Sequence, residues 1–172
     1  MALLTVDDFK VVLLRMMEGS PLSIARRLLG TDQDRVGTTW SRTAPSARNW
    51  WEIPEVQMRV RKLITGHPDL GVPEYVTRSF LRKKGLTALS LGSGIGNREV
   101  AWAKTGYFNQ ITGIDLSPER IRVAQATANA EGVQHILKFS CQDFFDASFE
   151  DNTFDVVFAE GILHHLSPVS KA

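Results

Sequence analysis

Three glycines at alternate positions follow a short apolar run and could place a backbone loop against a small ligand. The run Leu89–Leu91 leads into Gly92, Gly94 and Gly96. Glycine lets the chain bend sharply and lets a ligand approach the backbone closely, and the helix expected next points its N-terminus at that ligand. Asp115, 23 residues beyond Gly92 at the end of a second apolar run, could accept hydrogen bonds from two ribose hydroxyls. The pattern predicts a nucleoside-binding turn.

The spacing of the glycines separates two classes of nucleoside ligand. A dinucleotide site uses G-x-G-x-x-G, in which the third glycine lets the helix pack closely while pyrophosphate binds at the helix end. Here the third glycine comes one residue early, at Gly96, and Asn97 takes the dinucleotide position. The run Leu89–Gly96, which includes Ser90 and Ser93, instead resembles the first motif of class I S-adenosylmethionine (AdoMet)-dependent methyltransferases. In that family the loop receives the methionine part of the cofactor.

The segment Ile111–Glu119 resembles the second motif of the same family. The resemblance implies that Asp115 binds the cofactor ribose and that Leu116 packs against adenine. Ser117 and Pro118 predict a helix with a serine N-cap and proline at its first position. Asp115 could alternatively serve only to cap that helix.

Two later segments resemble the third and fourth elements of the family, so the match covers residues 86–166. The strand expected over Ile136–Asp143 is followed by Phe144. The resemblance implies that Asp143 accepts a hydrogen bond from the adenine amino group and that Phe144 covers the ring, although Phe144 could simply pack in the core. Phe154–Leu166 resembles the fourth strand and the loop that meets methionine and the acceptor. Together these elements predict AdoMet as cofactor and S-adenosyl-L-homocysteine as product.

One position departs from the family pattern. The family usually carries an acidic residue two positions before the first glycine to hold the cofactor ammonium group, and this chain has Ser90. A serine hydroxyl can accept a hydrogen bond but supplies no charge. Glu99 and Glu160 are candidates for the missing charge. The place of Glu99 near the start of a helix favours an exposed carboxylate.

The adjacent histidines His164 and His165 are the candidates for a general base, because imidazole titrates near neutrality. Either could instead be a helix-entry residue without a catalytic role. The loop Glu160–Leu163 lacks the Asn-Pro-Pro-Tyr pattern of enzymes that methylate planar amino groups. The sequence therefore favours O- or C-methylation of a small molecule.

Composition limits the partners. The 172 residues are 43% hydrophobic and carry a net charge of +1, but residues 1–85 hold +5 and residues 86–172 hold −4. We expect a basic helical face against an acidic sheet domain rather than a nucleic-acid surface. The single cysteine, Cys141, is expected in a buried strand. No signal peptide, membrane span or metal-ligand pattern is evident, which favours the cytoplasm.

Residues 1–85 predict a helical cap, and residues 86–172 predict an α/β domain with a Rossmann-like, doubly wound parallel sheet. Within the cap, helices are expected over residues 5–18 and 20–30, from 53 to about 65, and from 72 to about 84. Trp40, Trp50 and Trp51 could either shield an acceptor or fasten the cap to the sheet.

The sequence supplies four of the seven strands of a class I methyltransferase sheet, whose order is 3-2-1-4-5-7-6. The fourth strand, expected over Phe154–Ala159, would be an apolar edge open to strand addition. We therefore expect a fragment of a longer enzyme, or a partner chain that completes the edge. Ser167 and Pro168 resemble the start of a further helix.

The leading hypothesis is a small-molecule methyltransferase. A chain that only binds AdoMet, or that assembles through the fourth strand, is the alternative. A nicotinamide-dependent oxidoreductase is disfavoured by Asn97 and by the Asp143-Phe144 pair.

Overall fold

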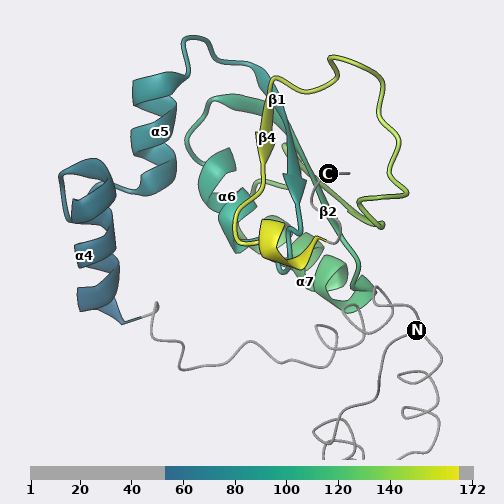
Figure 1. Cartoon of the computed structure of the whole chain (residues 1–172), viewed down its shortest axis with the longest axis horizontal. Helices are drawn as coiled ribbons and strands as arrows, with labels where there is room; N and C mark the ends of the chain where they lie inside the picture. The colour runs from purple at the N-terminus through teal and green to yellow at the C-terminus, as the bar shows by residue number, and fades with distance from the viewer. Residues whose placement is uncertain (1–52, 167–172) are drawn as a thin grey trace, which may run out of the picture. The chain divides into compact units, whose positions relative to one another are not determined.

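The computed structural model describes residues 53–166, and its centre is a four-stranded parallel sheet (Figure 1). The strand order is β3-β2-β1-β4, and every neighbouring pair is parallel. The strands are β1 (Leu86–Leu91), β2 (Phe108–Asp115), β3 (Leu137–Cys141) and β4 (Val156–Phe158). The Rossmann-like fold class and the order expected for the first four strands are confirmed.

Strand β1 lies in the middle of the sheet and is buried on both faces, as parallel strands usually are. Leu86 and Ala88 belong to one core cluster, whereas Leu89 and Leu91 belong to another. The first cluster also contains buried residues of two helices, α6 (Asn97–Ala103) and α7 (Pro118–Ala130), which follow β1 and β2 (Figure 1). Residues of the segments around β4 pack against the second cluster: Phe144, Ala147, Phe154, Ala159 and Ile162.

Helix α7 begins as its sequence predicts. Ser117 is the N-cap, its hydroxyl accepts from the Arg120 backbone N–H at 3.3 Å, and Pro118 is the first helical residue. This cap satisfies one of the N–H groups that the first turn leaves without a helical partner.

Two glycines, Gly113 in β2 and Gly96 before α6, leave room for the ring of Phe139. A Cβ on Gly113 would lie 2.6 Å from Phe139 Cδ1, and one on Gly96 would lie 3.0 Å from both Phe139 Cζ and Ala124 Cβ. The third glycine of the loop therefore permits close helix packing although it comes one residue earlier than in dinucleotide sites.

Within residues 53–166 two helices precede the sheet, and only one of them ends where expected. Helix α4 (Pro54–Thr65) ends at Gly66 in a left-handed conformation, as predicted. Helix α5 (Val72–Phe80) ends about four residues before the expected position. Beyond it, Lys83 Nζ is 2.9 Å from Asp155 Oδ1 and extended chain leads into β1. The chain leaves the helix at Leu81, whose backbone is extended with φ −93° and ψ 120°.

Three further expectations need correction. Strand β2 begins at Phe108, three residues before the segment Ile111–Glu119 that resembles the second motif, and β4 is shorter than the expected Phe154–Ala159. Cys141 is exposed rather than buried, because it ends β3, the outer strand of the sheet.

Some expectations concern residues outside the described part of the chain. These are the helices over 5–18 and 20–30, the three tryptophans Trp40, Trp50 and Trp51, and the start of a helix at Ser167. The division between a cap and a sheet domain at residue 85 likewise stays a prediction.

Among residues 53–166, no helix is both long and apolar enough to cross a membrane. The same residues contain no cluster of three or more His, Cys, Asp or Glu side chains that could hold a metal ion.

Replacement of Gly113 by alanine tests the close packing around Phe139. Because the new Cβ would overlap the ring and also lie 2.9 Å from Ser93 Cβ, we expect Gly113→Ala to destabilise the fold by about 1–3 kcal/mol in urea unfolding. Gly71→Ala is the matched control, since a Cβ there meets only Pro73 Cδ at 4.0 Å. Equal unfolding midpoints for the two variants would contradict this packing.

Candidate functional site: the glycine loop and the carboxyl edge of the sheet

The glycine loop connects β1 to α6 and requires glycine at each of its three positions. Gly92, Gly94 and Gly96 have φ angles of 66°, 57° and 81°, in the left-handed region that other residues rarely adopt. The Ser93 N–H donates to the Ile114 carbonyl oxygen at 3.0 Å. The loop is thus anchored to the neighbouring strand β2.

Asp115 joins the loop to the start of α7. Its Oδ2 accepts from the Gly94 N–H and its Oδ1 from the Ser117 N–H, each at 2.9 Å. Asp115 therefore does support the start of the next helix, which was the alternative role considered for it. A carboxylate offers about four acceptor positions, so two backbone bonds leave capacity for the hydroxyls of a ribose.

The chain just after β3, which resembles the third element of the family, lies directly beside Asp115. The Gln142 N–H donates to the Asp115 carbonyl oxygen at 3.0 Å, and Asp143 is the next residue. Asp143 Oδ1 accepts from the Phe145 N–H at 2.9 Å. Phe144 is partly buried and packs against the second core cluster, so core packing is at least part of its role. Leu116 is half-buried.

Glu99 is not the exposed carboxylate that its position suggested. It is 2% exposed, and Ser90 Oγ donates to its Oε1 at 2.6 Å. The buried residues of α6 include Glu99, Trp102 and Ala103, which are spaced i, i+3 and i+4 and therefore share one face. That spacing is visible in the sequence and places Glu99 on the apolar side of the helix.

The environment of Glu99 favours its neutral form. Burial raises the pKa of this carboxyl above its usual value, and the nearby Glu160 raises it further, while the Ser90 hydrogen bond and Arg98 act in the opposite direction. Within residues 53–166, two buried side-chain oxygens have no hydrogen-bond partner, Glu99 Oε2 and Ser93 Oγ. Ser93 is part of the glycine loop, and Glu99 is in the first turn of the helix that follows it.

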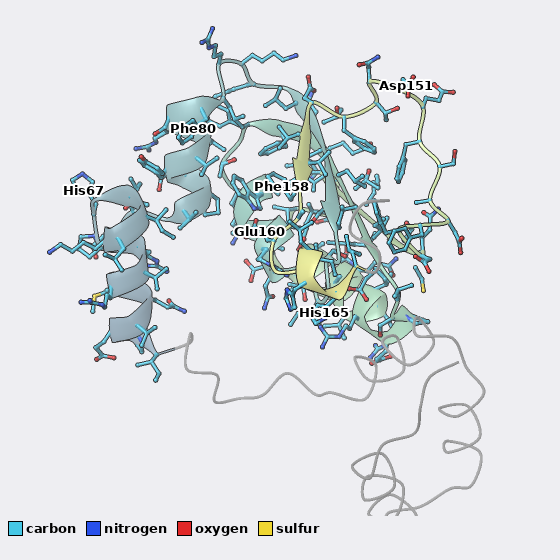
Figure 2. The ribbon with its side chains drawn as sticks, viewed as in Figure 1. His67, Phe80, Asp151, Phe158, Glu160 and His165 are labelled. Carbon is cyan, nitrogen blue, oxygen red and sulfur yellow. The ribbon has the colours of Figure 1, made fainter. Side chains whose placement is uncertain are left out.

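The segment after β4 packs against the same loop. A Cβ on Gly92 would lie 2.7 Å from Ile162 Cδ1, so Ile162 occupies the space that the glycine leaves. Trp102 Nε1 donates to Glu160 Oε1 at 2.7 Å, and the Arg98 guanidinium donates to the Glu160 carbonyl oxygen. Glu160 itself is exposed and lies just beyond Phe158, the last residue of β4 (Figure 2).

The two histidines lie in a short 3-10 turn, η2 (Leu163–His165), at the end of this segment. Their ring centroids are 3.8 Å apart at an interplanar angle of 44°. His165 is exposed, and its slight burial and the neighbouring His164 both lower its pKa. His165 is therefore suited to accept a proton near neutral pH.

The predicted site residues thus gather after the carboxyl ends of all four strands. At β1, Ser90 is the next-to-last residue and the three glycines follow the strand. At β2, Asp115 is the last residue and Leu116 follows it. Beyond β3 come Asp143 and Phe144, and beyond β4 comes Glu160. Parallel α/β sheets bind ligands at this edge, where neighbouring connections run to opposite sides of the sheet.

Comparisons with known proteins agree with this arrangement. A family model described as a methyltransferase domain matches residues 89–172. Ajmaline N-methyltransferase of Rauvolfia serpentina is 35% identical over 89 residues, which are 52% of this chain and 30% of that protein. Erythromycin 3''-O-methyltransferase of Saccharopolyspora erythraea is 35% identical over 83 residues, or 48% of this chain and 27% of that protein.

A solved structure shares the fold. The crystal structure of a SAM-dependent methyltransferase from Aquifex aeolicus superposes with a TM-score of 0.52 and 23% identity, over 72% of this chain and 63% of that one. The chain thus matches a methyltransferase-domain model over residues 89–172, just under half of its length, and shares the class I AdoMet-dependent methyltransferase fold. Its matched region spans less than a third of the length of the two curated methyltransferases named above.

The raised pKa of Glu99 gives the stability of this chain a testable pH dependence. The folded chain holds the Glu99 proton more tightly than the unfolded chain does, because the pKa of Glu99 is raised on folding. Protonated Glu99 therefore contributes its full stability at pH values below its pKa in the unfolded chain. That stability is lost as pH rises through its pKa in the folded chain. We expect Glu99→Gln to raise the free energy of unfolding at pH 8 and to change it little at pH 4. Denaturant unfolding at both pH values measures this difference.

Glu150→Gln is the matched control, because Glu150 is exposed and its replacement removes no buried charge. If Glu99→Gln has a lower free energy of unfolding than the parent chain at pH 8, then burial of the ionised Glu99 side chain does not destabilise the fold.

Proposed function

We propose that this chain binds AdoMet at the glycine loop and transfers its methyl group to a small molecule, releasing S-adenosyl-L-homocysteine. The observation that carries the proposal is the Asp115 carboxylate, which holds both the loop and the start of α7. This arrangement fits a nucleoside whose sugar lies at the end of β2. The unpartnered buried oxygens of Ser93 and Glu99 fit a polar ligand at the same loop.

Each part of the cofactor has residues suited to it. Asp115 would accept from the ribose hydroxyls, and Asp143 from the adenine amino group. Leu116 and Phe144 would pack against adenine. Residues at the carboxyl end of β1, in the glycine loop and after β4 would surround the methionine part: Ser90, Gly92, Ser93, Gly94, Gly96 and Glu160.

In the transfer, the protein would position the acceptor and exclude water rather than form covalent bonds with the substrates. The bound cofactor supplies a methyl group on a sulfonium, which is already a good leaving group. The chain must hold the acceptor in line with sulfur and methyl and keep water away. Ile162, seated on Gly92, is suited to exclude water, and His165 would accept the acceptor's proton at an imidazole nitrogen.

For the acceptor we propose an oxygen or carbon atom of a small molecule. The residues after β4 are Glu160-Gly161-Ile162-Leu163, without the Asn-Pro-Pro-Tyr pattern that suits planar amino groups. The two curated relatives are an N- and an O-methyltransferase by name. An aliphatic amine therefore belongs in the same acceptor assay as a comparison.

A second candidate function is an AdoMet-binding or assembly module without catalysis. Among the described strands β4 lies at an edge of the sheet, and its Val157 is 57% exposed. An exposed apolar edge can pair with a further strand, from this polypeptide or another.

Binding of AdoMet should depend on Asp115. Because Asp115→Ala removes the two backbone hydrogen bonds and the proposed ribose contacts, we expect calorimetry to show affinity reduced at least tenfold, about 1.4 kcal/mol or more. Asp151→Ala, in an exposed loop, is the control and should bind as the parent chain does. Thermal stabilisation by NAD but not by AdoMet would contradict the proposal.

Transfer itself should depend on His165. With labelled AdoMet and a panel of small alcohols, phenols, carbon acids and amines, we expect His165→Ala to lower kcat by about 10²–10⁴ while AdoMet affinity stays unchanged. In the parent enzyme kcat should fall as pH drops through the lowered pKa of His165, because the protonated ring cannot act as base. AdoMet binding without turnover on any acceptor would favour the non-catalytic module.

A further inference from the structure

The pair formed by Ser90 and Glu99 lies immediately below the glycine loop and has no assigned role. Ser90 is two residues before the first glycine of the loop, and Glu99 is three residues after the last. We propose that Glu99, positioned by Ser90, supplies the carboxylate that receives the ammonium group of the cofactor's methionine. This inference rests on the proposed function and concerns which residue replaces the acidic side chain absent from position 90.

The hydrogen bonding of Glu99 leaves one oxygen for such a ligand. Oε1 accepts from Ser90 Oγ at 2.6 Å, which fixes the orientation of the carboxylate. Oε2 is buried and has no hydrogen-bond partner, in a side chain that is 2% exposed. A buried carboxylate is costly unless it is paired and hydrogen-bonded, and an ammonium group provides both a charge and N–H donors.

The neighbouring charged groups leave Glu99 without a cation of its own. The two residues that act on it through charge are Arg98 and Glu160. Arg98 donates its guanidinium N–H to the Glu160 carbonyl oxygen, and Arg98 is exposed. Glu160 adds a second negative charge from the segment after β4, and its Oε1 is held by Trp102. The local balance therefore favours a positively charged ligand group.

The position of the pair also fits the methionine end of the cofactor rather than the adenosine end. Ser90 pairs in register with Gly113 of β2 and with Phe158 of β4, so it lies at the centre of the sheet. Asp115, the proposed ribose ligand, lies two residues beyond Gly113. The second unpartnered oxygen, Ser93 Oγ, lies within the loop itself.

The consequence is selectivity for the amino-acid part of the ligand. S-adenosyl-L-homocysteine carries the ammonium group, whereas 5'-methylthioadenosine has the same nucleoside and thioether without it. Glu99 should therefore contribute to binding of the first compound and not of the second.

Calorimetry on the full 172-residue chain with both compounds tests this assignment. We expect Glu99→Gln to weaken binding of S-adenosyl-L-homocysteine at least tenfold and to change 5'-methylthioadenosine binding by less than about twofold. Ser90→Asp in the Glu99→Gln background returns a carboxylate to the position the family uses, and should recover most of the lost affinity. Glu131→Gln, on an exposed side chain, should leave both affinities unchanged.

A pH series gives an independent readout. In the parent chain, affinity for S-adenosyl-L-homocysteine should fall as Glu99 becomes protonated, and affinity for 5'-methylthioadenosine should follow this fall much less. Glu99→Gln should remove the difference between the two profiles.

The possible failures are distinguishable. If the parent chain binds neither compound, the proposed function is wrong. If the parent binds both compounds and Glu99→Gln leaves both affinities unchanged, or weakens both equally, then AdoMet binding stands and the assignment of Glu99 is overturned.

Discussion

The carboxylate of Asp115 is the interaction on which the site depends. One oxygen holds the Gly94 N–H and the other holds the Ser117 N–H, so a single side chain fixes the glycine loop and the start of α7. The Gly94 donor lies in the loop that leaves β1, and the Ser117 donor lies two residues beyond the end of β2. Because a charged acceptor forms stronger hydrogen bonds than a neutral one, Asp115 fixes the backbone of the glycine loop without the help of a ligand.

The residues beside this loop combine close packing with a buried carboxyl group. Phe139 fits between Gly96 and Gly113 only because neither residue carries a Cβ. In the first turn of α6, Glu99 is buried with a single side-chain hydrogen-bond partner, which is an unfavourable arrangement for an ionised carboxylate. Functional sites are where such unfavourable arrangements are expected, since the ligand can supply the missing partner. A substitution that removes the Glu99 carboxylate should therefore stabilise the free chain and weaken its affinity for a cationic ligand.

Local signals predicted local structure well and tertiary contacts poorly. The Ser117-Pro118 cap and the glycine after α4 follow from nearby residues, and the structure confirms both. After the early end of α5, Lys83 meets Asp155, 72 residues away, a contact that no local pattern contains. Cys141 is exposed because β3 is an outer strand. The burial of Glu99 could have been foreseen, because its spacing from Trp102 and Ala103 places it on the apolar face of α6.

The central claim is that the glycine loop and the carboxyl edge of the sheet bind the cofactor. Backbone amide chemical shifts of the full chain, followed by NMR during titration with S-adenosyl-L-homocysteine, test it most directly. The account predicts saturable shifts concentrated at residues 90–99, 115–117, 142–145 and 160–163, with little change along α4. Shifts that do not saturate, or that centre on other parts of the chain, would contradict it.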